Sequence, residues 1–253
     1  MKKLLMAVTA VAALSSAAVA ADIPARAPAY KAPAAVTPTY SWTGCYIGAG
    51  GGYGMWNQEN QTVDVVGRPL DTVTKNGGRG WFGTAGVGCD YQIGSFVIGA
   101  FGDWDFGKLR GQMTSASYGV NGDEDLQWAW GAGGRIGYVI MPQLLGYISG
   151  GYTQANFSSV SFFDSVTGGP RGLSVGERTY NGWFLGSGYE YGLNFLLPGL
   201  FWKTEYRFAS YDNNNERNVL LGVNAVPGDA INSTKWVQTI KSQIVWRFNF
   251  GGF

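Results

Sequence analysis

The sequence contains no histidine and little charge. Its 253 residues hold 18 basic and 17 acidic side chains, a net charge of +1, and charged residues make up 14% of the chain, against about 25% in an average soluble domain. Without an imidazole group, Ser-His-Asp and Cys-His catalysis and histidine metal ligation are excluded. A chain this close to neutral also argues against nucleic acid as a partner. We expect no enzymatic activity, no cofactor and no metal.

Glycine and aromatic residues are abundant instead. The chain has 40 glycines, aromatics make up 15% and apolar residues 45%. This apolar content can form a large buried surface, so the chain is not expected to be disordered. The composition suits an all-β protein dense in turns.

The first residues carry the features of a secretory signal. Lys2 and Lys3 precede an apolar run over 4–14, and Ala18-Val19-Ala20 forms an A-x-A cleavage site. A membrane anchor helix is the alternative, but it needs about 20 apolar residues, more than this run has. We predict that residues 1–20 are a cleaved signal peptide and that the protein is exported to the cell outer membrane.

Residues 21–41 are rich in alanine and proline, a composition that favours extended polyproline II over a packed core. We predict a flexible periplasmic tail. In a sharper alternative, Arg26 and Lys31 contact the acidic peptidoglycan. Residues 42–253 then form the folded domain.

Eight strand-like segments with unequal connections follow. The connections after the first, third, fifth and seventh are long and polar, about 16 to 23 residues, whereas the others are short. This alternation places all long loops at one end of an up-and-down barrel, as in outer-membrane barrels. The predicted strands are 45–56, 80–93, 96–108, 125–140, 144–157, 179–192, 200–211 and 235–250.

Side chains alternate within these segments. In the last one, Ile244 and Trp246 share one face, and Val245 and Arg247 share the other. A soluble ligand-binding barrel alternates too, with its apolar face inward. Aromatics near strand ends, a polar face dominated by glycine, and the low total charge favour apolar residues outward in lipid. We therefore place the aromatics in lipid and the charges in the lumen.

Hydrocarbon offers no partner for backbone N–H and C=O groups, so a sheet that crosses it must close on itself. Eight strands enclose an interior that side chains can fill. The predicted fold is an all-β, eight-stranded antiparallel up-and-down transmembrane β-barrel.

The lumen face carries charges of both signs, so buried ions can pair there. We expect four toward the periplasmic end, namely Asp90, Glu190, Lys203 and Arg247, and five nearer the middle, namely Asp103, Arg135, Glu205, Arg207 and Lys241. One interpretation is a structural plug. The alternative is a narrow solute path lined by these charges.

Cys45 and Cys89 are the only cysteines, and an exported chain reaches an oxidising compartment. Pairing them sets an antiparallel register with Ile47 opposite Val87 and an apolar, lipid-facing column. Directly opposed residues fit disulfide geometry, so we predict a structural disulfide.

The segment 172–176 matches the G-x-S-x-G pattern of hydrolases. We place it in a long loop, where no histidine can activate Ser174, and set the match aside.

Several weak motifs occur together, in an order that resembles the small immunogenic outer-membrane β-barrel proteins of alphaproteobacteria, often labelled porin-family. They are Trp42-Thr43-Gly44-Cys45-Tyr46-Ile47-Gly48, Gly88-Cys89-Asp90-Tyr91-Gln92 and Lys203-Thr204-Glu205-Tyr206-Arg207-Phe208, with the Ala/Pro tail and the aromatic end. The resemblance implies a barrel like the OmpA membrane domain, with surface-antigen and envelope-integrity roles and no catalytic residues. A terminal aromatic, Phe250 or Phe253, would be recognised by the barrel-assembly machinery.

We expect an integral outer-membrane barrel with a structural and surface-antigen role. Its partners would be outer-membrane lipid, lipopolysaccharide and the assembly machinery. A narrow-pore porin that passes small solutes is the alternative function.

Overall fold

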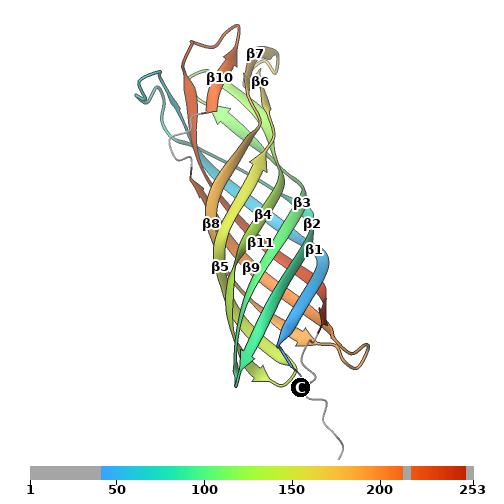
Figure 1. Ribbon diagram of the computed structural model, residues 1–253. Coiled ribbons are helices and arrows are strands. Elements are labelled where there is room, and N and C mark those ends of the chain that lie inside the picture. The colour runs from blue at the N-terminus through green and yellow to red at the C-terminus, as the bar shows by residue number, and fades with distance from the viewer. Residues whose placement is uncertain (1–40, 213–217, 249–253) are drawn as a thin grey trace, which may run out of the picture. The chain divides into compact units, whose positions relative to one another are not determined.

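A computed structural model describes residues 41–212 and 218–248 (Figure 1). The predicted signal peptide at 1–20 lies outside the described residues, as do positions 21–40 of the predicted tail. Phe250 and Phe253 lie outside them as well.

The described residues form antiparallel strands. No helix among them is long and apolar enough to cross a membrane. The strands are β1 (Gly44–Val63), β2 (Thr74–Ile93), β3 (Phe96–Ser115), β4 (Val120–Met141), β5 (Leu144–Phe157), β6 (Val160–Asp164), β7 (Pro170–Val175), β8 (Arg178–Gly192), β9 (Leu200–Asp212), β10 (Asn218–Gly222) and β11 (Ala230–Phe248).

Eight of these strands close into a ring. Neighbours follow the order β1-β2-β3-β4-β5-β8-β9-β11, and β11 pairs back onto β1 from Cys45↔Phe248 to Val63↔Ala230. The tilted strands of this ring can be followed in Figure 1. The predicted eight-stranded antiparallel barrel is therefore confirmed.

The three short strands continue the barrel wall at the end with the long loops. There β6 pairs with β4 and β7, and β10 pairs with β7 and β11. In sequence, β6 follows β5, β7 precedes β8, and β10 follows β9, so each short strand extends a long one past a break. The predicted long loops are thus partly strand. Gly172 to Val175 of the G-x-S-x-G match lie in β7, without a following helix.

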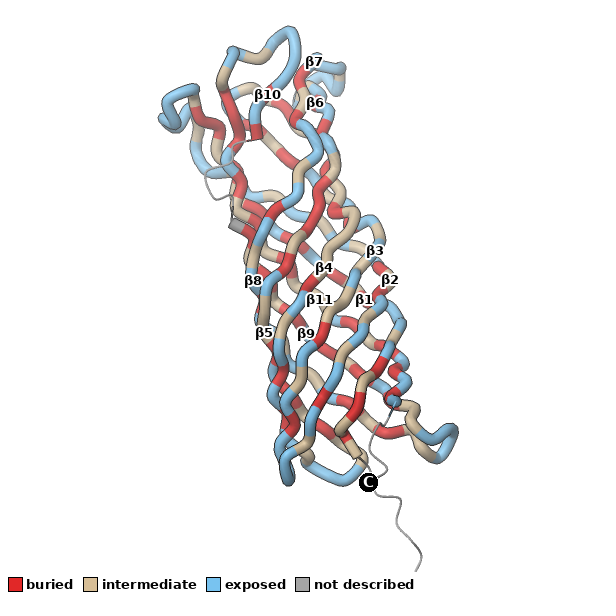
Figure 2. Tube along the Cα trace, viewed as in Figure 1, coloured by how far each residue is buried: buried red, intermediate tan, exposed pale blue. Residues whose placement is uncertain are grey.

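The two faces of the wall differ in exposure. On β11, Val245 and Arg247 are buried while Ile244 is 51% exposed and Trp246 39% exposed. The same alternation of buried and exposed residues runs along the other strands in Figure 2. Apolar side chains that include Phe82, Phe101, Phe184 and Phe201 pack together inside the ring.

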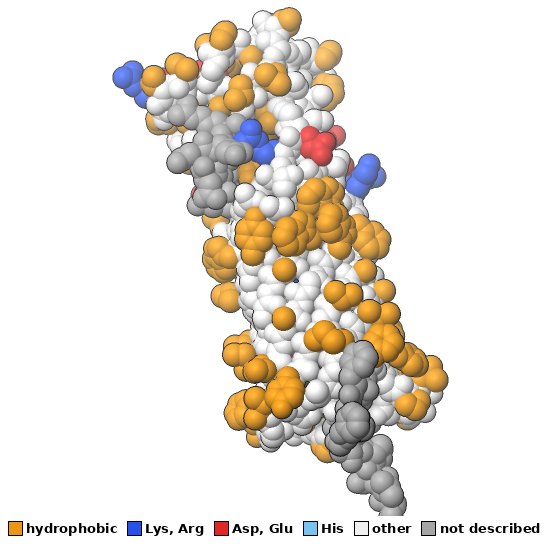
Figure 3. All heavy atoms as spheres, in the orientation of Figure 1, with side chains coloured by type: hydrophobic (Ala, Val, Ile, Leu, Met, Phe, Trp, Pro, Cys, Tyr) orange, Lys and Arg blue, Asp and Glu red, His pale blue; other side chains and the backbone are white. Residues whose placement is uncertain are grey.

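Exposed and half-buried aromatics form two girdles on the outer face, seen in Figure 3 as two bands of hydrophobic side chains. The girdle near the short turns contains Tyr91, Phe96, Tyr138, Trp202 and Phe248, and the girdle toward the long loops contains Tyr53, Trp81, Trp104, Trp128 and Trp183. Neighbouring rings pack together, as in the stacked Trp104–Trp128 pair at 5.1 Å between centroids.

The spacing of the girdles matches a bilayer. On β2, Trp81 and Tyr91 are 91 − 81 = 10 residues apart. With about 3.3 Å per residue and a tilt of about 45°, this separation spans about 23 Å along the barrel axis. Apolar bands of outer-membrane barrels are about 25 Å tall.

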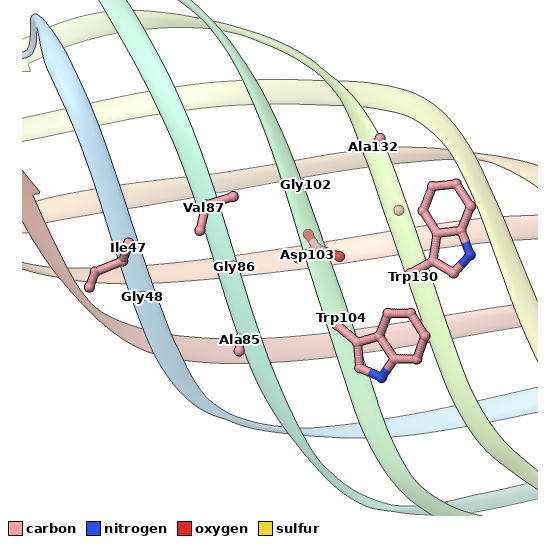
Figure 4. A pocket seen from close by; sticks show the side chains of 11 residues that line it. Ile47, Gly48, Ala85, Gly86, Val87, Gly102, Asp103, Trp104, Trp130 and Ala132 are labelled. Carbon is pink, nitrogen blue, oxygen red and sulfur yellow. The ribbon is translucent and has the colours of Figure 1, made fainter.

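Between the girdles, several positions of the barrel wall have small side chains or none, which leaves a shallow depression in the outer surface. Gly48, Gly86, Gly102 and Ala132 line part of a shallow groove across β1 to β4, beside Trp104 (Figure 4).

Above the girdle on the long-loop side, the wall has a second apolar core. Met113, Phe162, Leu173, Leu220 and Ile231 are buried there, together with Val120, Val160 and Val175. Because β6, β7 and β10 supply five of these eight side chains, the interrupted strands close this end of the barrel over an apolar interior.

A hydrogen bond ties two loops together at this end. The Tyr118 hydroxyl donates to Asp229 Oδ2 at 2.6 Å, joining the β3–β4 turn to the loop before β11. Partial burial, followed by this hydrogen bond to a carboxylate, raises the pKa of Tyr118 above its ordinary value.

A disulfide joins Cys45 on β1 to Cys89 on β2, across a sequence separation of 44 residues. The strands pair Ile47 with Val87 and Ala49 with Ala85. The bond cross-links the short-turn ends of the first two strands, on the outer face.

Candidate functional site in the barrel lumen

Among the residues that the structure describes, six acidic and six basic side chains face the lumen, and their formal charges cancel, 6 − 6 = 0. The acids are Asp90, Asp103, Asp105, Glu124, Glu190 and Glu205, and the bases are Arg135, Lys203, Arg207, Lys235, Lys241 and Arg247. All nine charges predicted to face the lumen are among them. Eleven of them lie in three layers along the barrel axis, and Lys203 lies between two of these layers.

The short-turn layer is a closed ring of four charges, Asp90, Arg135, Glu190 and Arg247. Arg247 donates to Asp90 Oδ2 at 2.7 Å and to Glu190 Oε1 at 2.6 Å. Arg135 donates to Glu190 Oε2 at 3.1 Å and holds both Asp90 oxygens. The four side chains are at most 1% exposed. Alternating signs let each buried ion face two partners, which offsets the cost of leaving water.

Aromatic rings and the segment before β1 cover this layer. Trp42 is fully buried, its carbonyl accepts from Arg247 Nη1 at 2.8 Å, and its ring lies 5.4 Å from the guanidinium carbon. Tyr46 packs its ring 4.8 Å from the Arg135 guanidinium carbon. The start of the described chain therefore closes the short-turn mouth of the lumen.

The middle layer is built on Arg207. Its guanidinium donates to both oxygens of Asp103, at 2.8 and 2.6 Å, and its Nε donates to Glu205 at 2.9 Å. Lys241 bridges Asp103 at 3.2 Å and Asp105 at 3.3 Å. The face of Phe184 lies 4.1 Å from the Arg207 guanidinium carbon. A bidentate arginine–carboxylate pair fixes geometry as well as charge.

Lys203 lies between these two layers in a different setting. Its ammonium group lies 5.3 Å from the Phe101 ring and 5.7 Å from the rings of Tyr46 and Tyr147. It makes no ion pair within the described part of the chain. The middle layer carries three carboxylates and two bases, so Lys203 balances its remaining negative charge at longer range.

The long-loop layer contains one ion pair inside an aromatic cage. Lys235 Nζ donates to Glu124 Oε1 at 2.7 Å and to the Gln58 side chain. The rings of Phe157, Tyr180 and Trp56 surround the ammonium group at 4.2, 5.1 and 5.3 Å. Lys235 joins β11 to β1 and β4 across the lumen.

Packed side chains separate the middle and long-loop layers. A cavity of about 20 Å³ borders Phe82, Asp105, Leu109 and Val237, which is room for about one water molecule. At this level, packed side chains leave little free volume between the two layers.

The predicted position of one charge along the barrel axis, that of Arg135, is wrong. Arg135 was expected near the middle, but it belongs to the short-turn layer, because its long side chain extends down to Asp90 and Glu190. Side-chain reach along a tilted strand cannot be read from the position of the Cα atom alone.

Three lumen charges were missed. Asp105 and Lys235 share the lumen parity of their neighbours Asp103 and Lys241, so the alternation contained the signal. Glu124 carried no such signal. A bulge on β4 between Leu126 and Trp128 reverses the facing of residues beyond it, so strict alternation from Trp128 points Glu124 outward.

Within the described residues, no group of three or more histidine, cysteine or acidic side chains could hold a metal ion. The carboxylates in the lumen are engaged with arginine and lysine instead. This arrangement can rigidify and close a barrel.

Similar proteins of known location come from the bacterial outer membrane. No family model matches the chain. A 31 kDa outer-membrane immunogenic protein of Brucella melitensis is 28% identical over 204 residues, covering 77% of this chain and 82% of the relative. A 25 kDa outer-membrane immunogenic protein of Brucella abortus is 28% identical over 232 residues, covering 85% and 87%. The chain resembles these Brucella proteins, and it is an outer-membrane β-barrel protein.

Solved structures of outer-membrane barrels are similar as well. Outer membrane protein OprG of Pseudomonas aeruginosa is 11% identical, with a TM-score of 0.47, covering 81% of this chain and 97% of that one. Neisserial surface protein A is 13% identical, with a TM-score of 0.40, covering 81% and 98%.

Proposed function

We propose that the barrel is a closed membrane anchor that supports the envelope and displays its long-loop end as a surface antigen. The observation that carries the proposal is the charge-balanced lumen. Three layers of paired ions, with aromatic rings between them, fill the space through which a porin would pass solutes. The proposal assigns no catalysis, because the buried ions are held in structural pairs.

A closed barrel and a narrow pore differ in the ion conductance that they predict. We expect the refolded protein to give no resolved conductance steps in planar lipid bilayers, because each layer would have to dissociate before an ion could pass. Regular, ion-selective steps from the unmodified protein would favour the porin and refute the plug.

A lumen-widening variant provides the control. The double substitution Glu205→Ser and Arg207→Ser removes one charge of each sign, so the lumen stays neutral while the middle layer loses its largest side chain. Asp103 keeps Lys241 as a partner. Because the other two layers stay closed in this variant, we expect ions to leak only when the charge-neutral changes Glu190→Ser/Arg247→Ser and Glu124→Ser/Lys235→Ser are added. Leakage through that combined variant would show that the assay detects an opened barrel.

Surface display is suggested by the names of the Brucella relatives and by the folded long-loop end. The turn between β6 and β7 is well exposed, with Val166 at 91%. An epitope peptide inserted after Thr167 should bind antibody on intact cells. The same peptide inserted at Gly94, in the short β2–β3 turn, should bind only after the outer membrane is permeabilised. Equal labelling of both sites on intact cells would refute the orientation.

Lipid, lipopolysaccharide and the barrel-assembly machinery remain the expected partners. A contact of the tail with peptidoglycan falls on residues outside those that the structure describes.

A further inference from the structure

Three basic residues stand together on the outer face of β2 and β3, just beyond the girdle on the long-loop side. Arg79 lies two residues beyond Trp81, which is 77% exposed, and Lys108 lies two residues beyond Phe106, which is 54% exposed. Arg110 is the third. All three basic residues are exposed. We call Arg79, Lys108 and Arg110 the basic patch.

The packing of neighbouring glycines shows which way the patch faces. Gly78 and Gly111 lie against the ring of Trp56, which is fully buried in the lumen. Because successive residues of a strand point to opposite faces, Arg79 and Arg110 point away from the lumen. They are direct cross-strand partners in the β2–β3 register.

Two arginines placed opposite each other repel, which destabilises a sheet unless an anion lies between them. The chain offers partial compensation. Lys75 already neutralises the nearby Glu59 at 2.9 Å. Asp125 lies across β4 from Arg110, but no ion pair joins them among the described residues. Asp123, two residues from Asp125 along β4, is exposed and lies across from Gln112. The patch, Asp123 and Asp125 together carry 3 − 2 = +1.

The pairing of β3 with β4 is also irregular beside the basic patch. The β3–β4 register shifts between Phe106 and Leu109, so β3 bulges at Gly107-Lys108. Bulges re-aim side chains and increase local twist. Lys108 lies two residues from Arg110 along β3, so the two side chains share the outer face, next to Arg79.

We propose that the basic patch binds the phosphate groups of lipopolysaccharide in the outer leaflet. Aromatic girdles lie at the level of the lipid headgroups, so side chains immediately beyond them reach the depth of those phosphates. The planar donor forks of two adjacent arginines suit phosphate oxygens. A phosphate between Arg79 and Arg110 would also relieve their repulsion. This binding site goes beyond the proposed anchor and does not depend on whether the lumen conducts.

The test measures binding of purified lipopolysaccharide to the refolded full-length protein in detergent micelles, by the shift in thermal unfolding midpoint as lipid is titrated. We expect the midpoint to rise with phosphorylated lipopolysaccharide and to change much less with the enzymatically dephosphorylated form. The shift should also weaken at high salt, because exposed charges are screened.

The double variant Arg79→Gln/Arg110→Gln should bind about tenfold or more weakly, since it loses charge-assisted hydrogen bonds to phosphate. It should fold without the lipid, because it removes like charges that face each other. The matched control Lys75→Gln/Arg171→Gln removes two exposed basic residues outside the patch and should bind like the unmodified protein.

Three results would overturn the proposal. The dephosphorylated lipid could bind as tightly as the phosphorylated one, which would assign the contact to acyl chains. The two double variants could lose affinity equally, which would leave only a general electrostatic attraction. Inorganic phosphate could raise the midpoint as much as the lipid at equal concentration, which would make the patch a site for free anions.

Discussion

Replacing Glu190 by alanine should lower the free energy of unfolding by about 3–5 kcal/mol, the usual cost of removing one partner from a buried ion pair. The Glu190 side chain is 0% exposed and accepts from both Arg135 and Arg247. Without it, two buried guanidinium groups share the single carboxylate of Asp90. Equilibrium urea unfolding in lipid vesicles measures the change.

An exposed pair supplies the comparison. Glu59→Ala breaks the ion pair with Lys75, whose side chain is 78% exposed, and should cost at most about 1 kcal/mol. The double variant Glu190→Ala/Arg135→Met restores neutrality in the ring, so its cost should be less than the sum of the two single costs. Similar small costs for Glu190→Ala and Glu59→Ala would contradict a tightly packed, water-poor lumen.

Replacing Ile244 by arginine should cost about 2–4 kcal/mol, the penalty measured for a basic side chain on the lipid face near the bilayer midplane. Ile244 is 51% exposed on the outer face of β11, between the two girdles. An arginine there has no polar partner unless it reaches a headgroup. Urea unfolding of the refolded variant in vesicles measures this cost.

The matched control is Asn232→Arg, on the same strand and the same face but beyond the girdle on the long-loop side. Asn232 is exposed to solvent at this level, so the substitution should cost about 0–1 kcal/mol. Equal costs at both positions would mean that the apolar band does not sit in hydrocarbon.

The barrel could be predicted from sequence because a membrane imposes strict conditions. Closure and alternate facing follow from the absence of hydrogen-bond partners in lipid, and the last strand shows the result at Ile244, Val245, Trp246 and Arg247. The half of β1 nearest the long loops could not be predicted in the same way. Gln58, Asn60 and Thr62 are buried there, although they are polar.

The reason is that the barrel wall beyond the long-loop girdle is surrounded by water rather than by lipid. Its outer face is polar, and its inner face mixes amides with apolar side chains, so the alternation that identifies a membrane strand is lost. Asn57-Gln58-Glu59-Asn60 has the composition of a loop, yet Gln58 and Asn60 form part of a paired strand. Tertiary pairing with β2 and β11 decides the structure of this segment.

The candidate site was predictable in composition but not in detail. The alternation identified nine lumen charges, because those residues occupy the inner parity of regular strands. The alternation did not show which layer the Arg135 guanidinium reaches, because this depends on its long side chain. It also did not show that Glu124 faces the lumen, because this depends on a bulge in β4. Such features follow from the packed structure alone.

Spin labels would show which side chains of β11 face lipid and which face the lumen. Single labels at positions 242, 243, 244 and 245 would be placed in turn in the refolded barrel, and their collision with dissolved oxygen would be measured in a lipid bilayer. We expect high oxygen collision at 242 and 244, where side chains face lipid, and low collision at 243 and 245, where Gln243 and Val245 are buried. High collision at 243 and 245 with low collision at 242 and 244 would contradict this expectation.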